Sequence, residues 1–347
     1  MSPGGFAPQS ERWSNAMKAL RIGVVGYGAI GRHHARNLNG RDDIVFVGVA
    51  DEQPEARAAA AALGYRTYSS VQTLIAAGLD AVVIAVPTSE HEAVAEIFAD
   101  RSIAILLEKP IAPTLDAARR VIARCSQRGV PLMIGYIERY NPAMEAVRDF
   151  VAEGNLGRLI SMTARRVGVF PPRIKDANVI VDISVHDIDI VAFITNARLE
   201  LISAQGGMAV LSDRLDYASL MLSAAGCAVS IETNWITPVK IRELSITGTH
   251  GFCQVDYITQ DARFAPGRSF EPSATYQQLV AQYTEGMLLS LPVNKREPLA
   301  RELEVFINGV RGGALPDPRL AIASLRIAEE ATELIHRSFK PNIAVIA

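Results

Sequence analysis

The segment Leu20–Leu38, LRIGVVGYGAIGRHHARNL, carries the pattern that decides the fold of the first half of the chain. Its first six residues, Leu20–Val25, form an apolar run with the length of a short buried strand. A helical pattern then opens with the G-x-G-x-x-G run Gly26-Tyr27-Gly28-Ala29-Ile30-Gly31. The first glycine permits a tight turn, the second lets a pyrophosphate approach the backbone, and the third lets helix and strand pack closely. A phosphate is then stabilised at the helix N-terminus by free N–H groups and the helix dipole.

An acidic residue follows at the spacing typical of a dinucleotide-binding unit. The second apolar run, DIVFVGVAD, ends in Asp51, twenty residues after Gly31. A carboxylate at that place accepts hydrogen bonds from the adenosine ribose hydroxyls. Glu52 and Gln53 come next, with no adjacent arginine or lysine to bind a 2′-phosphate. The pattern therefore predicts NAD rather than NADP, and the context disfavours a glycine turn in an unrelated α/β unit.

Apolar runs and helical patterns continue to alternate up to about residue 136. This alternation predicts a doubly wound parallel sheet, which binds ligands at the carboxyl ends of its strands. We expect those ends at Gly26, Asp51, Pro87-Thr88 and Glu108-Lys109-Pro110. An ammonium group at Lys109 would polarise a substrate hydroxyl and assist its deprotonation. The alternative is an ordinary surface lysine.

The second half of the chain has a different pattern. The segments DYASLMLSAAGCAVSIETNW and IRELSITGTHGFCQVDYITQ each indicate two strands around a turn, without a helix between them. Such pairs are typical of an antiparallel sheet. We expect a disordered tail over residues 1–17, a Rossmann domain over 18–136, and an α+β domain over 137–347 with a terminal helix over 318–338. Met17 is a candidate alternative start of translation.

The apolar stretch IVDISVHDIDIV, Ile180–Val191, contains ionisable residues that a buried core avoids. Asp182 and His186 share one face whether the stretch is a strand or a helix, because four residues is two strand repeats or about one helical turn. A carboxylate beside an imidazole raises its basicity, as a general base requires. The alternative is a structural histidine at a helix start with Asp182 near the N-cap. We expect Asp189 to be structural and Asp187 to be solvated or capping.

Composition excludes several classes of function. With 347 residues, 49% hydrophobic and 21% charged, the chain resembles an ordinary globular protein of two domains. A net charge of −2 gives no electrostatic basis for binding nucleic acid or an anionic membrane. The three cysteines are far apart, and neither they nor the six histidines show metal-ligand spacing. No apolar run reaches the length of a membrane span. These observations favour a cytoplasmic protein without a metal.

Five segments in order, VGYGAIGRHH, VPTSEHEAVA, LLEKP, ERYNP and IVDISVHDID, resemble the Gfo/Idh/MocA oxidoreductase family. The resemblance implies an N-terminal Rossmann domain and a C-terminal α+β domain with a large, mostly antiparallel open sheet. It implies Lys109, Asp182 and His186 as catalytic residues, and we expect Asp182 and His186 to face a cleft between the domains. The cofactor-binding set that we predict is Gly26, Gly28, Ala29, Ile30, Gly31, Asp51, Pro87, Thr88, His91, Glu108 and Lys109. The run KDANVI stands where many members have glycines before the aspartate, which puts the shape of that loop in question.

Within the family, VGVFPPRI and the segment from Asn234 to Gln260 are similar to enzymes that oxidise the 3-hydroxyl of UDP-N-acetylglucosamine, feeding lipid A synthesis. A diphosphate substrate needs cationic partners, for which we predict Arg173, with Arg165 and Arg166 as alternatives. Tyr136 and Asn141 are predicted to line the sugar pocket. We expect a dimer or tetramer, since such open sheets commonly pair between subunits. Dehydrogenation of a free polyol such as inositol, and a non-catalytic NAD-binding sensor, are the alternative functions.

Overall fold

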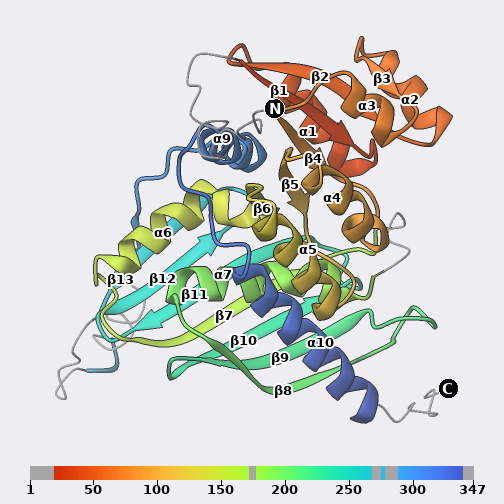
Figure 1. Cartoon of the computed structure of the whole chain (residues 1–347). Helices are drawn as coiled ribbons and strands as arrows, with labels where there is room; N and C mark the ends of the chain where they lie inside the picture. The colour runs from red at the N-terminus through yellow and green to blue at the C-terminus, as the bar shows by residue number, and fades with distance from the viewer. Residues whose placement is uncertain (1–18, 172–176, 268–274, 278–287, 339–347) are drawn as a thin grey trace. The chain divides into compact units, whose positions relative to one another are not determined.

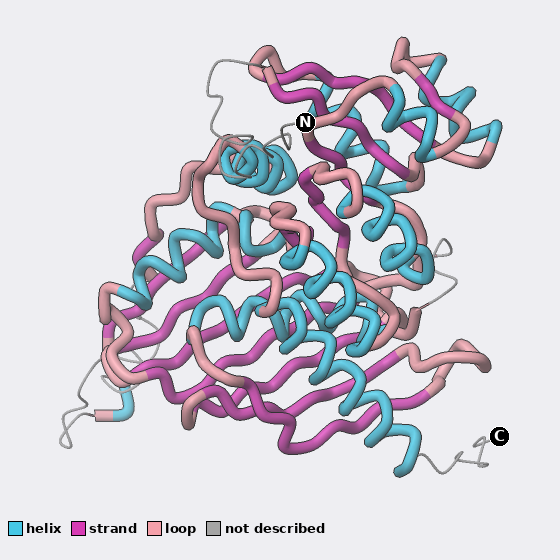
Figure 2. The backbone as a smooth tube through the Cα atoms, viewed as in Figure 1, coloured by secondary structure: helices cyan, strands magenta, loops and turns pink. Residues whose placement is uncertain are grey.

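The chain forms two compact units. The computed structural model describes residues 19–171, 177–267, 275–277 and 288–338, so the predicted tail over residues 1–17 lies outside the described part. One unit comprises Met1–Ile137 and Glu297–Ile322, and the other comprises Glu138–Arg296 and Ala323–Ala347 (Figures 1 and 2). The chain first passes from one unit to the other between Ile137 and Glu138, close to the predicted boundary between residues 136 and 137. The return of Glu297–Ile322 to the first unit differs from the predicted single boundary.

The first unit contains a six-stranded sheet in the order β3-β2-β1-β4-β5-β6, with every pair parallel. Its strands are β1 (Leu20–Val25), β2 (Ile44–Ala50), β3 (Thr67–Tyr68), β4 (Ala81–Ile84), β5 (Ala104–Glu108) and β6 (Leu132–Gly135). The strand order reverses between β1 and β4, which is where doubly wound sheets bind their ligands. The predicted Rossmann architecture is confirmed.

Helices connect these strands and cover the sheet. They are α1 (Ala29–Asn39), α2 (Pro54–Ala61), α3 (Val71–Ala76), α4 (His91–Ala99), α5 (Leu115–Gln127) and the returning α9 (Pro298–Val310). Helix α9 packs on α1, and α4 packs on α5. Thr114 caps α5 by accepting a hydrogen bond from the Ala117 N–H. A 3₁₀ turn over Thr88–Glu90 (η2) leads into α4.

The second unit contains an eight-stranded sheet in the order β14-β13-β12-β11-β7-β10-β9-β8. The strands are β7 (Leu159–Val167), β8 (Leu199–Gly207), β9 (Tyr217–Ala224), β10 (Cys227–Asn234), β11 (Ile241–Gly248), β12 (Gly251–Asp256), β13 (Asp261–Pro266) and β14 (Leu289–Ser290). Only β7 and β10 run parallel among these pairs; the others are antiparallel. The hairpin turn predicted around Ala225 and Gly226 is confirmed, with φ of 50° and 83° at these residues.

Helices cover one face of this sheet. They are a short 3₁₀ turn η3 (Ile137–Tyr140), α6 (Pro142–Ala152), a π-helical turn η4 (Ile180–Ser184), α7 (Val185–Thr195) and α10 (Leu320–Ser338), which begins in the first unit. Helix α6 packs on β12 and β13, and α7 packs on β7, β9 and β10, as Figure 1 shows. Within the described ranges, no helix has both the length and the apolar character needed to cross a membrane.

Candidate active site

The glycine loop after β1 forms a cradle that side chains would fill. Gly26 has φ of 89°, and a Cβ atom there would lie 2.5 Å from the Ala85 carbonyl oxygen. A Cβ atom on Gly31 would clash with the Gly26 carbonyl oxygen, so this glycine lets α1 approach the strand. At Gly28 a Cβ atom would meet nothing within 4 Å, and no side chain caps α1 there. The first N–H groups of α1 therefore face open space suited to a phosphate.

A pocket of about 690 Å³ lies at the carboxyl ends of β1, β2 and β4, and Gly26, Gly28, Asp51 and Pro87 are among its lining residues. The Asp51 carboxylate accepts hydrogen bonds from the N–H groups of Tyr27, at 2.7 Å, and Gln53, at 2.8 Å. The glycine loop and the loop after β2 thereby orient Asp51. The cradle, the open helix end and the oriented acid together fit a dinucleotide.

Several acidic side chains line this pocket. Glu52 and Glu90 line the pocket together with Asp51. Burial raises the pKa of Glu90, and the nearby charges of Glu52 and Asp51 raise it further. A 2′-phosphate would add negative charge to this group, so the electrostatics favour NAD over NADP.

His91 connects the loops that follow β4 and β5. Its ring is buried, with Nδ1 2.9 Å from the Pro110 carbonyl oxygen and Nε2 3.1 Å from that of Val86. Burial lowers the pKa of His91, although both carbonyls oppose this shift. His91 therefore lies behind the predicted cofactor edge, where it links the two loops. Thr88 lies in η2, three residues before His91, and is partly exposed.

The end of β5 holds Glu108 and Lys109 in different environments. The Glu108 carboxylate is buried, lies 2.6 Å from Nε2 of His34, and accepts a hydrogen bond of 3.2 Å from the Lys109 N–H. A Cβ atom on Gly135 would approach this carboxylate at 3.3 Å, so the glycine at the end of β6 makes room for it. The Lys109 side chain is partly exposed, and the peptide bond to Pro110 is cis. His34 is itself fully buried.

Asp182 lies in the π-helical turn η4, and His186 lies in the first turn of α7. The Asn178 side chain caps the start of this segment, because its Oδ1 accepts from the N–H groups of Ile180 at 2.9 Å and Val181 at 3.0 Å. Asp182 follows this cap in the first turn of the helical segment, so it lies near the N-cap, as the alternative interpretation expected. Both Asp182 and His186 are partly exposed, whereas Ile183, Ser184 and Val185 between them are buried. π-Helical turns inside helices are frequent at functional sites.

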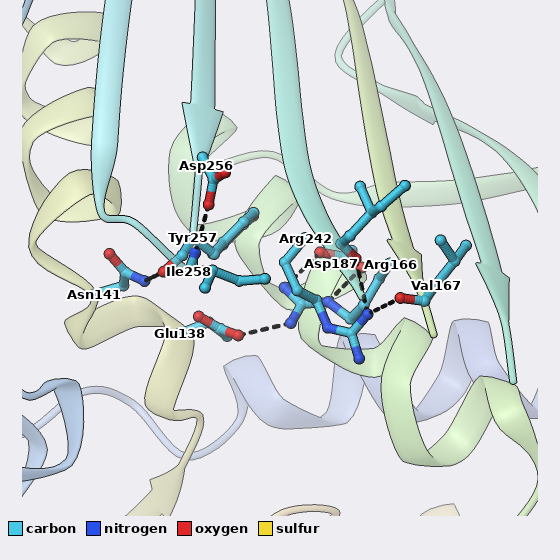
Figure 3. A network of polar contacts seen from close by, with 10 residues as sticks. Glu138, Asn141, Arg166, Val167, Asp187, Arg242, Asp256, Tyr257 and Ile258 are labelled. Carbon is cyan, nitrogen blue, oxygen red and sulfur yellow. Dashed lines mark hydrogen bonds and ion pairs between the residues drawn. The ribbon is translucent and has the colours of Figure 1, made fainter. Parts of the chain in front are cut away.

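The other two acids of this stretch are buried in ion pairs. Asp187 receives two hydrogen bonds from Arg166, at 2.8 and 2.9 Å, and Arg166 also donates to Glu138 at 2.6 Å (Figure 3). Burial raises the pKa of Asp187, and the Arg166 guanidinium opposes that rise. We interpret the bidentate contact as an ionised pair. The expectation of a solvated or capping Asp187 is wrong, because the sheet and helix remove it from water.

Asp189 is structural, as predicted. It is buried and accepts a hydrogen bond of 2.6 Å from Nε of Arg139, in η3. The Arg139 guanidinium also lies 5.8 Å from the centre of the Phe193 ring. These contacts join η3 to α7.

The predicted substrate-binding residues have varied surroundings. Arg165 is exposed and pairs with Glu232 across the sheet at 3.0 Å, while Arg166 is buried in the network above. Arg173 lies outside the described residues. Asn141 uses its side-chain oxygen to cap α6 and donates to the Tyr257 carbonyl oxygen at 3.0 Å. Tyr136 is buried at the end of β6.

Arg242, which the sequence did not single out, lies beside this network. It stands directly opposite Arg166 in the register of β11 and β7. Its Nη1 donates to the Val167 and Ile241 carbonyl oxygens at 2.6 and 2.8 Å (Figure 3). Burial and the neighbouring Arg166 lower the pKa of Arg242, and Asp182 is among the acids whose charge opposes this. A cation within electrostatic reach of Asp182 is thus part of the candidate site. Strand alternation alone gave no signal for it.

Comparisons with known proteins agree with this fold. Residues 20–136 match the family described as "Oxidoreductase family, NAD-binding Rossmann fold", and residues 144–254 match the GFO/IDH/MocA C-terminal domain. A UDP-N-acetylglucosamine 3-dehydrogenase from Acidithiobacillus ferrooxidans is 30% identical over 293 residues, covering 84% of this chain and 88% of that protein. Its solved structure covers 92% of this chain and 99% of its own, with a TM-score of 0.80 and 27% identity. An inositol 2-dehydrogenase from Rhizobium meliloti is 27% identical, covering 94% of this chain and 99% of that protein.

Proposed function

The chain belongs to the Gfo/Idh/MocA oxidoreductase family, and on this basis we propose that it oxidises the 3-hydroxyl of UDP-N-acetylglucosamine to a ketone. The chain is an NAD-dependent dehydrogenase with a Rossmann domain. The proposed 3-keto product is the form that an aminotransferase converts to an amine, as amide-linked lipid A requires.

In the proposed mechanism, His186 removes the proton of the sugar hydroxyl as general base. Asp182, one helical turn earlier, stabilises the imidazolium that forms. Lys109 supports the developing alkoxide by its positive charge. The glycine cradle and Asp51 would hold NAD, which would supply the acceptor for the hydride of the same carbon.

The observation that carries this proposal is the division of the ionisable residues in Ile180–Val191. Asp187 and Asp189 are buried in ion pairs, while Asp182 and His186 remain partly exposed. An acid and an imidazole on one helical face, supported by rigid paired neighbours, have the preorganisation that a general base needs. A purely structural role for His186 would not require the side chains of both Asp182 and His186 to remain partly exposed.

A nucleotide-sugar substrate also needs a cationic partner, and we propose Arg242 for this role. Its Nη1 donates to two backbone carbonyl oxygens, and these contacts fix the guanidinium plane. A guanidinium held in this way can present its other N–H groups to a phosphate oxygen. Arg166 is the poorer candidate, because Asp187 and Glu138 already engage all three of its nitrogens.

A panel of UDP-sugars and free polyols with NAD, followed by NADH absorbance, tests the substrate. We expect turnover with UDP-N-acetylglucosamine and competitive inhibition by UDP. The similarity to an inositol 2-dehydrogenase supports a second candidate, oxidation of a free polyol. Turnover of inositol that is insensitive to UDP would select that candidate, and no turnover with any sugar would favour an NAD-binding sensor.

The Arg242→Gln variant separates the roles of the guanidinium. We expect the KM for the UDP-sugar to rise about tenfold or more, because a charged hydrogen bond to phosphate is lost. Arg165→Gln on the neighbouring strand is the matched control and should change this KM little, since its pair with Glu232 is exposed. Equal effects of the two substitutions would remove Arg242 from the proposed subsite.

We also propose that a second copy of the chain covers the open sheet of the second unit. Ile202 on β8 and Tyr217 and Met221 on β9 are large apolar side chains that are 64%, 38% and 42% exposed. Apolar side chains gathered on one sheet favour association. Light scattering after gel filtration should show a dimer or tetramer that Met221→Glu weakens; an unchanged monomer in both proteins would contradict this.

A further inference from the structure

Three ionisable side chains meet inside the first unit, away from the pocket described above. They are His34 on α1, Glu108 at the end of β5 and Glu302 on α9, and their polar atoms all lie within 4.8 Å of one another. All three side chains are buried, and Glu302 is 0% exposed. Helix α9 reaches this place because residues 297–322 return to the first unit.

Glu302 differs from Glu108 in its partners. Glu108 accepts from the Lys109 N–H and lies in hydrogen-bond contact with Nε2 of His34. Within the described residues, neither carboxyl oxygen of Glu302 has a hydrogen-bond partner. An ionised carboxylate without a partner is very costly to bury, so such a group takes up a proton instead.

The surrounding charges do not offset this cost. From α1 the facing group is His34, which is engaged with Glu108, and from β5 it is Glu108 itself. On α9, Arg301 pairs with Glu304 at 3.1 Å, and both side chains are partly exposed. Burial raises the pKa of Glu302 well above its usual range, and the charge of Glu108 raises it further.

Histidine and two glutamates are residue types that bind metal ions. The short distance between two of their polar atoms, however, favours a hydrogen bond over a bound metal ion. Two ligands bound at about 2.0–2.2 Å to one ion, at angles near 90–110°, lie about 3 Å or more apart. Nε2 of His34 and Oε1 of Glu108 are only 2.6 Å apart, the distance of a strong hydrogen bond. A hydrogen bond therefore joins these two atoms, and a metal bound by both would require them to separate.

We propose that Glu302 is a proton-binding site of the cofactor-binding unit, kept as a neutral carboxylic acid at neutral pH beside the Glu108–His34 pair. The folded first unit keeps this proton at a pH where the same carboxyl in the unfolded chain has already ionised. The first unit therefore loses stability as pH rises above the unfolded pKa, by a mechanism that is independent of the substrate.

Infrared spectroscopy tests the protonation state directly. The C=O stretch of a carboxylic acid is absent from ionised carboxylates, and at neutral pH few acids are expected to show it. We expect a buried carboxylic acid band in the wild-type protein that Glu302→Gln removes. Glu304→Gln, two residues along the same helix and partly exposed, is the control and should leave the band unchanged. A wild-type spectrum without this band would overturn the proposal.

The pH dependence of melting gives a second test. A carboxyl whose pKa is higher in the folded than in the unfolded protein destabilises the fold progressively as pH rises above the unfolded value, about 4.3. Glu302→Gln and Glu302→Leu lack this loss. The melting temperature of each variant minus that of the wild type should therefore increase by about 4 °C or more between pH 5 and pH 9. A constant or shrinking difference would contradict a proton on Glu302. Lower melting of the wild type after addition of EDTA, restored by Zn²⁺ or Mn²⁺, would identify a metal site instead.

Discussion

The cofactor pocket of the first unit and the Asp182–His186 face of the second are built from different parts of the polypeptide. Around Gly28 the pocket is formed by backbone, namely a glycine cradle and the open N-terminus of α1. The Asp182–His186 face is formed by side chains, which stand beside Asp187 and its buried ion pair with Arg166. Single side-chain removals should therefore have larger effects in the second unit, where function depends on few groups.

Buried acids show the same contrast at the level of energetics. Burial raises the pKa values of Asp187, Asp189 and Glu302 alike. An arginine opposes this rise at both aspartates, whereas at Glu302 the charge of Glu108 adds to it. Equally buried acids thus form ion pairs with arginine in the second unit, whereas in the first unit the proposed outcome is a protonated Glu302.

His186→Ala should give the largest kinetic effect of the catalytic face. We expect turnover to fall by about two to four orders of magnitude, the range for a positioned base, with NAD binding nearly unchanged. His250→Ala, an exposed histidine in the same unit, is the control. A loss of only a few fold would return His186 to a structural role and remove the proposed difference between the two regions.

Asp189→Ala tests the buried scaffold. Removing one partner of a buried ion pair leaves an uncompensated charge, so we expect about 3–5 kcal/mol less unfolding free energy. Urea denaturation monitored in the second unit measures this. The double variant Asp189→Leu/Arg139→Met should recover much of the loss, because an apolar pair replaces both charges. No recovery would show that packing around Asp189, rather than charge, determines the effect.

Lys109→Met tests whether the positive charge at the end of β5 takes part in the reaction. Methionine keeps most of the side-chain length without its charge, so folding should survive. We expect turnover to fall about a hundredfold, because a charge aimed at an alkoxide acts mainly in the transition state. UDP affinity should persist, and Lys295→Met is an exposed control. Lost UDP binding would identify Lys109 as a phosphate ligand, and retained turnover would make it a surface lysine.

Asp51→Ala should have the smallest effect on turnover, because Asp51 belongs to the cofactor pocket, which is formed mainly by backbone groups. We expect weaker NAD binding and about a tenfold relaxed preference over NADP, since both an acceptor for the ribose and a repulsive charge are lost. Asp42→Ala, on the exposed loop before β2, is the control. An unchanged ratio of NAD to NADP affinity would show that Glu52 and Glu90 set the preference.

Much of the fold followed from local patterns. The G-x-G-x-x-G spacing, the position of Asp51 and the alternating runs predicted the parallel sheet, because backbone requirements repeat at fixed spacing along the chain. The short β3 and α3 were not predicted, since a strand of two residues and a helix of six leave little periodicity. The π-helical turn was also missed, because Asp182 and His186 share a face in either regular structure.

The sequence by itself determined the cofactor class, the two sheets and the identity of the candidate catalytic pair, since each depends on residues close together in the chain. Only the tertiary structure decided the state of the buried charges. Asp187 and Arg166 are 21 residues apart, and Glu302 lies 194 residues beyond Glu108. Whether an acid meets a guanidinium, water or another acid depends on which distant element packs against it, and in a low-dielectric interior that neighbour decides whether the acid keeps its charge.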